Sequence, residues 1–294
     1  MVCLHSNETI VSSNHVVNMP ELPEVEVTRM GIAPHIEGRT VRQMVVRQPQ
    51  LRWLIDANLP EWLKNAQIER TERRSKYLIV HCACTQGRRG VLLIHLGMSG
   101  SLRIVAKGTP PQKHDHVDLV FENTTLRFRD PRRFGTVLWH EGGAIATHPL
   151  IAIMGVEPLT DAFNADWLYD QTRRRSMPIK PLLMDSHRIV GIGNIYASES
   201  LFLAGISPLR AAGSLSRPRC QRLAEAIRTT LQNSIAAGGS SVRDYVHSDG
   251  GAGSFQLHCA VYDRAGEACP QCQRPIRSLR QAGRSSFYCA HCQR

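Results

Sequence analysis

Aromatic residues are scarce in this 294-residue sequence, and it contains no long apolar run. Phe, Trp and Tyr make up 6% of the chain and hydrophobic residues 42%, a composition typical of an ordinary soluble protein. No apolar segment approaches the roughly 20 residues that a membrane-spanning helix needs. The first 18 residues have neither a basic start nor a continuous apolar centre, so they do not resemble a secretory signal. We therefore expect a cytoplasmic protein that does not enter a membrane.

Acidic residues are fewer than basic residues in this sequence. The chain has 25 Asp and Glu against 36 Lys and Arg, a formal net charge of +11, and its isoelectric point is about 9.5. This basic excess suits a polyanionic partner, with nucleic acid ahead of a membrane surface. A basic solvated surface has the same composition, so charge alone does not select between the two.

The nine cysteines do not form a disulfide framework, because the chain is long and lacks an export signal. Cys269 and Cys272 form one C-x2-C pair, and Cys289 and Cys292 form a second pair after 16 residues. Two such pairs converge on one tetrahedral Zn²⁺, with a β-hairpin between them. Four thiolates leave no open coordination position, so we predict one structural zinc ion. The remaining cysteines are expected to be buried or free thiols: Cys3, Cys82, Cys84, Cys220 and Cys259.

The periodicity of apolar residues changes along the chain. Residues 21–36 have helical spacing, and Pro20 suits the start of a helix. Short β-rich runs without intervening helices then predict an antiparallel sandwich or barrel. These runs are Val41–Val46, Tyr77–Cys82, Val91–Leu96, Val117–Phe121 and Leu126–Phe128. After about residue 150 helical patterns follow, at Asp166–Gln171, Ile195–Ala204 and Arg217–Ala236. The expected fold class is α+β with several domains.

Two loops have residue types that suit nucleic acid. Gly191–Asn194 precedes a helix whose first N–H groups could face a phosphate, although a tight turn needs the same residues. Asp130–Gly135 places two arginines and an aromatic residue at the end of a strand, which suits a phosphate contact beside a wedge between bases. The alternative is a strand-end turn with a buried Phe134, which the motif alone favours. Met98 has the same two interpretations: a side chain that fills the protein core, or a wedge that inserts between bases.

Alternation along the strand predicted at Val117 places His114, His116 and Asp118 on one face. Two histidines and a carboxylate suggest a metal, but the sequence offers no further ligand for them. A polar strand face or a phosphate contact is the favoured interpretation.

Met19–Glu26 contains the best candidate nucleophile. If the chain began at Pro20, a free secondary amine would stand beside the carboxylate of Glu21; within a longer chain Pro20 is an amide and cannot attack. An α-amino group is on the order of 10% neutral at pH 7, against roughly 0.04% for an ordinary lysine. An iminium ion formed by such an amine on a sugar aldehyde is an electron sink that favours elimination of phosphate.

These motifs, in this order, resemble the bacterial formamidopyrimidine-DNA glycosylases. The resemblance covers residues 19–294 and rests on Met19–Glu26, Arg74–Leu78, the segments around Met98 and His114, Asp130–Gly135, Gly191–Ser200 and the four spaced cysteines. It implies a catalytic β-sandwich at 19–150, a helix–two-turn–helix DNA-binding domain at 151–250, and a lesion-recognition loop with a zinc-finger hairpin at 251–294. Residues 1–18 lie outside the family pattern, and we expect them to be disordered or absent from the mature protein.

The resemblance also implies residue roles. Pro20 would attack the anomeric carbon of the damaged nucleoside, Glu21 would be the general acid and base, and Lys76 would contact phosphate and assist elimination. Met98, Arg132 and Phe134 would fill the gap left by the extruded nucleotide. Phosphates would be held by His114, Asn194 and Arg284, the last of which we also count as catalytic. Ser176 stands at a DNA-binding position that is often basic in the family.

The activity implied is excision of oxidised purines, such as 8-oxoguanine and formamidopyrimidines, followed by nicking through β,δ-elimination. The implied partner is duplex DNA with oxidised bases or abasic sites, bound by a monomer at the bacterial nucleoid. Base preference is less defined, because Ser248–Phe255 has Ala252 and Ser254 where proline and an aromatic residue are expected.

Two alternatives remain open. An endonuclease VIII-type enzyme would remove oxidised pyrimidines, but Leu22-Pro23 favours the purine-type branch. A non-catalytic protein that binds damaged DNA would result if residues 1–18 were retained, because Pro20 would then stay blocked.

Overall fold

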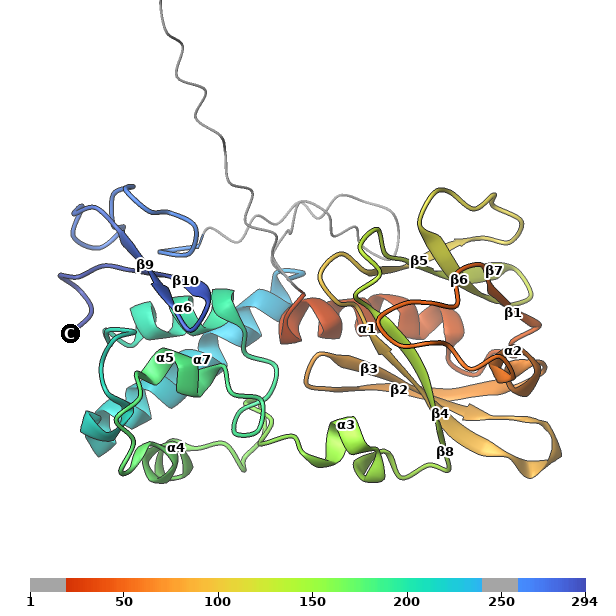
Figure 1. Cartoon of the computed structure of the whole chain (residues 1–294), viewed down its shortest axis with the longest axis horizontal. Helices are drawn as coiled ribbons and strands as arrows, with labels where there is room; N and C mark the ends of the chain where they lie inside the picture. The colour runs from red at the N-terminus through yellow and green to blue at the C-terminus, as the bar shows by residue number, and fades with distance from the viewer. Residues whose placement is uncertain (1–19, 240–258) are drawn as a thin grey trace, which may run out of the picture.

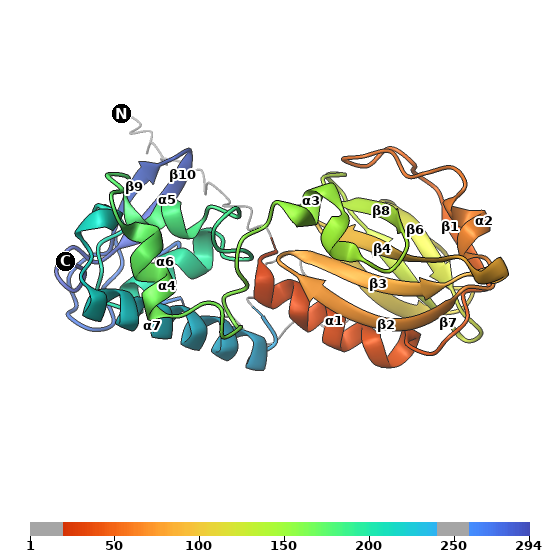
Figure 2. The same ribbon diagram turned by 90° about the horizontal axis from the view of Figure 1, so that it is seen from below.

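The computed structural model describes residues 20–239 and 259–294, which form a β-sandwich beside a helical part that carries a C-terminal hairpin (Figures 1 and 2). The N-terminal extension and the predicted lesion-recognition loop at Ser248–Phe255 lie outside the described residues. In the part that is described, no helix is long and apolar enough to cross a membrane.

The sandwich consists of two four-stranded antiparallel sheets, as predicted. One has the order β1-β6-β7-β5 and the other β2-β3-β4-β8. The strands are β1 Gln43–Val46, β2 Gln67–Arg74, β3 Tyr77–Ala83, β4 Arg89–His95, β5 Ser101–Ala106, β6 Asp115–Val120, β7 Thr124–Arg129 and β8 Thr136–Glu141. Strands β2, β5 and β8 were not among the predicted runs. In β2 only Ile68 and Thr71 of the eight residues are buried, which leaves a mostly polar sequence without an apolar run.

The predicted shared face of His114, His116 and Asp118 is wrong. Strand β6 begins at Asp115, and His114 precedes it with a φ of 75°. A register shift between Asp115 and Val117 then breaks the alternation. The cause is a β-bulge, which a period-two pattern cannot anticipate. His116 instead hydrogen-bonds the backbone oxygen of Asp130, at 2.8 Å.

The helical part forms where helical periodicity was predicted. Its longer helices are α4 Ala165–Thr172, α6 Asn194–Leu203 and α7 Arg217–Ala236. Helix α5 Ile179–Leu183 is shorter. Helix α2 Leu59–Leu63 belongs to the sandwich, because Leu59 and Leu63 pack into the sandwich core, and α3 Pro149–Ala152 follows the last strand of the sandwich. Helix α3 lies in the connection between the sandwich and the helical part (Figure 1).

Helix α1, Leu22–Ile36, joins the two parts. Glu21 and Glu24 form a capping box at its start, and Pro23 occupies its first turn. Leu22 packs into the hydrophobic core of the helical part, whereas Val25, Ile32 and Ile36 pack into the core of the sandwich. Figure 2 shows α1 along the sandwich with α7 beyond its start. The N-terminus of α1 is thus inserted into the helical part.

The hairpin of β9 Arg277–Gln281 and β10 Arg284–Tyr288 confirms the expectation for the residues between the cysteine pairs. Arg284 pairs with Gln281 at its tip, and Arg277 pairs with Tyr288 at its base. The C-terminal residues dock on the helical part, because Gln293 Nε2 donates to Ile206 O at 2.9 Å. The tip of the hairpin and the cysteines therefore lie at opposite ends of this C-terminal unit.

Candidate active site and DNA-binding surface

Glu21 lies at the N-terminus of α6. Its Oε2 accepts a hydrogen bond from Gly193 N–H at 2.6 Å, and its Oε1 accepts one from Ile195 N–H at 3.0 Å. A β-carbon on Gly193 would overlap the carboxyl group, so the close approach requires glycine. The N–H groups that Gly191–Asn194 was predicted to offer to a phosphate therefore hold the chain's own carboxylate.

This site favours a proton on Glu21. The side chain is 3% exposed. Burial raises the pKa of Glu21, against the opposing charge of Lys76, and the negative charge of Glu24 raises it further. A carboxyl group whose pKa lies nearer neutrality is better matched to general acid and base work. Pro20 precedes it directly and is also buried, so the structure brings the candidate nucleophile and the candidate acid to one place.

Lys76 lies in the two-residue turn between β2 and β3, directly after Ser75, which has a φ of 58°. Desolvation lowers the pKa of Lys76, the carboxylate of Glu21 raises it, and the charge of Arg284 lowers it again. These couplings identify Glu21, Lys76 and Arg284 as electrostatic neighbours, although they come from α1, a sandwich turn and the hairpin tip. The predicted catalytic residues are therefore gathered from all three parts of the fold.

Lys180 of α5 is a site residue that the sequence prediction missed. Its Nζ is buried and donates to Asn194 Oδ1 at 2.7 Å, to Ser286 Oγ at 2.8 Å and to Ser285 O at 3.1 Å. Burial lowers the pKa of Lys180 to about 8. The lysine thus orients the amide of Asn194 and ties the hairpin to the helical part. The available signal was a lysine between Ile179 and Pro181, in an otherwise uncharged segment.

His95, at the end of β4, is a second residue that was missed. Desolvation, together with the positive charges of Lys76 and Arg52, lowers its pKa to about 4. Its Nδ1 accepts from Gly97 N–H at 2.9 Å, so the neutral ring carries its proton on Nε2. A neutral imidazole beside Lys76 offers one directed donor, and it also fixes the turn that bears Met98.

Met98 and Phe134 lie on two turns in contact with each other, because a β-carbon on Gly97 would overlap the backbone of Phe134. Phe134 is 44% exposed, so the alternative of a buried Phe134 is wrong. The guanidinium of Arg132 lies 4.8 Å from the Phe134 ring centroid. Met98 is half-buried. An exposed phenylalanine stacked with an arginine is suited to insertion between bases.

Asp130 holds these turns together. The fully buried carboxylate accepts from Ser99 Oγ at 2.6 Å, from Gly135 N–H at 2.7 Å and from Arg132 N–H at 3.2 Å. The sequence motif contained Asp130, but only the fold reveals that its partners come from both turns. Asp130 is therefore the support of the exposed aromatic group.

The other predicted DNA contacts are more peripheral. His114 is partly exposed, and desolvation together with nearby positive charges lowers its pKa. Ser176 is exposed in the loop before α5, as is Arg174. Among the described residues, no hydrogen bond links His114 or Ser176 to Glu21 or Lys76. The structure leaves both side chains accessible without placing them at the catalytic centre.

The four cysteines fit a zinc ion. Their sulfur atoms all lie within 4.8 Å of one another, with 3.8 Å between Cys269 and Cys292 and 3.5 Å between Cys272 and Cys289. Thiolates about 2.3 Å from a tetrahedral Zn²⁺ would be roughly 3.8 Å apart. The described cysteines form no disulfide.

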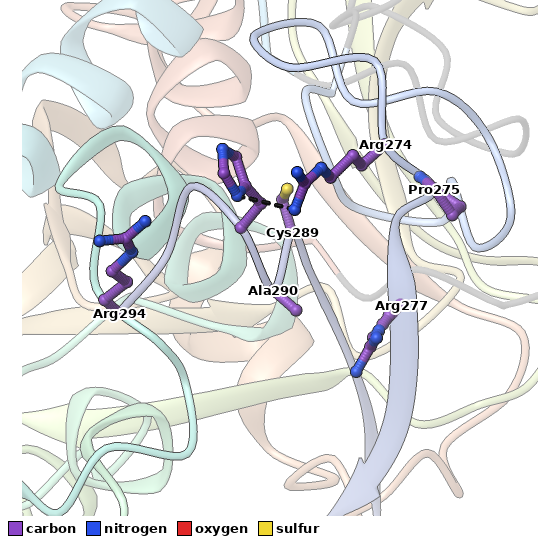
Figure 3. A pocket seen from close by; sticks show the side chains of 7 residues that line it. Arg274, Pro275, Arg277, Cys289, Ala290 and Arg294 are labelled. Carbon is purple, nitrogen blue, oxygen red and sulfur yellow. Dashed lines mark hydrogen bonds between the residues drawn. The ribbon is translucent and has the colours of Figure 1, made fainter.

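A basic pocket of about 260 Å³ adjoins this site (Figure 3). Arg274 Nη1 lies 2.9 Å from His291 Nδ1 there, and Arg277 and Arg294 also line the pocket. His291 faces Arg274 as a hydrogen-bond acceptor, so the four sulfurs complete the metal site without it.

Three family models match consecutive parts of the chain. They are the formamidopyrimidine-DNA glycosylase N-terminal domain at residues 19–137, the formamidopyrimidine-DNA glycosylase H2TH domain at 154–246, and the zinc finger found in FPG and IleRS at 266–294. The chain belongs to the formamidopyrimidine-DNA glycosylase family. This confirms the resemblance, the helix–two-turn–helix domain and the zinc finger.

Relatives in this family match nearly the whole chain. A formamidopyrimidine-DNA glycosylase of Dechloromonas aromatica is 56% identical over 277 residues, which are 94% of this chain and 100% of the relative. One of Bordetella avium is 52% identical with the same coverage. The crystal structure of the MutM (Fpg) protein from Thermus thermophilus has a TM-score of 0.81 at 38% identity, covering 93% of this chain and 98% of that one. The Lactococcus lactis Fpg in complex with DNA containing an abasic site has a TM-score of 0.84 at 32% identity, covering 93% and 99%.

Proposed function

We propose that this protein is a bifunctional DNA glycosylase and AP lyase of base excision repair, acting as a monomer on oxidised purines in duplex DNA of the bacterial nucleoid. The observation that carries the proposal is the buried carboxyl group of Glu21, held next to Pro20 and beside the amine of Lys76. Family membership supports the same activity, since the relatives are named formamidopyrimidine-DNA glycosylases. A Lactococcus lactis neighbour was solved with DNA containing Fapy-dG.

The chemistry requires a free amine on Pro20. The neutral nitrogen would form a bond to C1′ of the nucleoside, and the damaged base would leave with the bonding electron pair and take up the proton that the nitrogen releases. Glu21 would supply a proton to the opening sugar and take one back in a later step. The raised pKa of Glu21 supports this exchange, because it makes the protonated carboxyl group more accessible.

Elimination would follow from the iminium ion joining Pro20 to C1′. Loss of a C2′ proton to a base expels the 3′ phosphate, and a second elimination expels the 5′ phosphate, with the iminium as the electron sink. Lys76 and Arg284 would face the phosphates, while Asn194, oriented by Lys180, would hold the backbone. The zinc ion, held by Cys269, Cys272, Cys289 and Cys292, would keep the hairpin rigid and would not take part in the reaction.

Exposure of the Pro20 amine requires removal of the residues before it. The family model begins at residue 19, and the aligned part of the relatives covers 94% of this chain. We propose that the active form begins at Pro20.

Borohydride reduction tests the proposal, because it converts an iminium into a stable covalent adduct. A chain beginning at Pro20 should be trapped on an 8-oxoguanine duplex and on an abasic duplex, and Pro20→Gly should lower the yield. A matched chain beginning at Met1 should bind the same duplexes without adduct. Intact mass of the natively expressed protein identifies the form that the cell makes. A native chain that retains Met1 and is never trapped would support the non-catalytic DNA-binding alternative instead.

A further inference from the structure

The turn that carries Lys76 is held by a carboxylate from outside the sandwich. Glu157 Oε1 accepts a hydrogen bond from Ser75 N–H at 2.6 Å. Ser75 has a φ of 58°, which side-chain-bearing residues rarely adopt, so the bond stabilises an uncommon backbone conformation directly before Lys76. Glu157 follows α3, after the last strand of the sandwich.

Two arginines of β2 complete this contact. Arg73 Nη1 lies 2.9 Å from Glu157 Oε2, and Arg74 Nη1 lies 3.0 Å from Oε1. Arg73 Nη1 also donates to Ser75 O at 2.9 Å, so both ends of the turn residue are held. The side chain of Glu157 is 14% exposed and that of Arg73 10%, so water screens these contacts far less than a surface ion pair.

The backbone beside Glu157 belongs to the helical part. Val156 N–H donates to Arg188 O at 2.7 Å, and Val190 N–H donates to Val156 O at 3.0 Å. Gly155 lies so close to Arg188 that a β-carbon there would overlap its carbonyl group. Glu157 therefore projects across the junction from a fixed base.

The same stretch of the helical part also holds Glu21. Gly193 and Ile195, which bind the carboxylate of Glu21, follow Val190 by only a few residues. The segment from Arg188 to Ile195 thus sets the place of Glu21 directly and the place of Lys76 through Glu157.

We propose that Glu157 is a positioning residue: by fixing the turn at Ser75, it holds the Lys76 amine at a defined position relative to the carboxyl group of Glu21. The inference rests on the proposed function, because it gives Lys76 a role in elimination. An ion pair that merely stabilised the junction would affect folding and would not depend on Lys76.

A double-mutant cycle separates these roles. Single-turnover nicking of an abasic duplex would be measured for chains beginning at Pro20 with Glu157→Ala, Lys76→Ala or both. Glu157→Ala should slow nicking by about 10- to 100-fold while DNA affinity stays within about 3-fold, because a displacement near 1 Å is enough to lose this much rate. In the Lys76→Ala background the same substitution should change the rate by less than about 2-fold. An equal loss in both backgrounds would overturn the proposal.

Two variants serve as controls. Glu122→Ala removes another glutamate paired with an arginine, Arg42 at 2.7 Å, on an exposed surface, and it should leave nicking unchanged. Glu157→Gln keeps an oxygen for Ser75 N–H and should retain more activity than Glu157→Ala. It also keeps the test available if the alanine variant does not fold.

Hydrogen exchange provides a readout that does not depend on catalysis. Exchange of the Ser75 amide should be slow in the unmodified chain and at least about 10-fold faster in Glu157→Ala, with no change in Glu122→Ala. An unprotected Ser75 amide would refute the positioning contact even if the enzyme is active. Failure of borohydride trapping by the unmodified chain would instead refute the proposed function.

Discussion

Glu21 occupies the place that an external anion would take at the start of a helix. Its two oxygens accept N–H groups of Gly193 and Ile195, yet burial raises its pKa. The hydrogen bonds fix its orientation, and the desolvation keeps a proton accessible. The Glu21 side chain is therefore held in one orientation beside Pro20, with a pKa that suits proton transfer.

Replacing Glu21 by glutamine tests this role. The amide keeps one acceptor for the α6 N-terminus but has no proton to exchange, so DNA binding should persist while base excision falls by at least about 100-fold. Excision of 8-oxoguanine and binding to an abasic analogue would be measured on the chain beginning at Pro20. Glu61→Gln, at an exposed position in α2, is the matched control. Undiminished excision in Glu21→Gln would remove Glu21 from the mechanism.

Lys180 gives a pH dependence of stability. Burial lowers its pKa in the folded protein to about 8 from the ordinary 10.5. Between these values the unfolded chain binds more protons at this site, so the contribution of Lys180 to the free energy of unfolding rises with pH. The difference in unfolding free energy between the unmodified chain and Lys180→Met should therefore increase by about 2 kcal/mol from pH 8 to 10. Denaturant unfolding of both proteins across this range measures it, and a flat or falling difference would contradict the assignment.

At the scale of elements, loops are positioned by partners from neighbouring segments. The turn with Met98 and the turn with Phe134 share the carboxylate of Asp130, and the turn before Lys76 depends on Glu157. In the first case the functional side chains are exposed or half-exposed, while the carboxylate that holds them is buried. Because the buried carboxylate of Asp130 holds the turn, the exposed side chain of Phe134 keeps one position even when no DNA is bound.

Asp130→Ala tests the first of these supports. It leaves the donors of Ser99, Gly135 and Arg132 without their common acceptor, so the free energy of unfolding should fall by about 3 kcal/mol. Lesion binding should weaken as well, because Phe134 loses its fixed turn. Denaturant unfolding checks the first effect and titration of a lesion duplex the second. Asp161→Ala, at an exposed position, should change stability by less than about 0.5 kcal/mol.

At the scale of the whole molecule, the candidate site exists only at the junction of the parts. Glu21, at the start of α1, is bound by N–H groups of the helical part, and Lys180 joins Asn194 to the hairpin. The charge of Arg284, at the hairpin tip, lowers the pKa of Lys76 in the sandwich. None of the parts contains a complete set of these groups. DNA bound across the junction would therefore meet residues from every part at once.

Zinc removal tests the dependence on the hairpin. Without the metal, the four thiols no longer close the base of β9 and β10, so Arg284 should lose its fixed place and DNA binding should be abolished. Affinity for an abasic duplex would be measured before and after chelation, with re-addition of Zn²⁺ as the control for reversibility. Tight binding by the metal-free protein would contradict this scaffold role.

Features that depend on local spacing could be predicted from the amino-acid sequence alone. The helix at Arg217–Ala236, the β-rich runs and the paired cysteines follow from periodicity, caps and ligand spacing, which act over a few residues. The resemblance to the family implies that Glu21, Lys76 and Arg284 belong to one site.

Which groups come into contact depends on the tertiary fold. The N–H groups of Gly193 and Ile195 bind a carboxylate more than 170 positions away, Phe134 is exposed, and His114 precedes strand β6 with a positive φ. The positions of Lys180, His95 and Glu157 depend on partners that local sequence patterns do not predict. Long-range contacts of this kind depend on how whole elements pack, because each needs the backbone of both partners already in position.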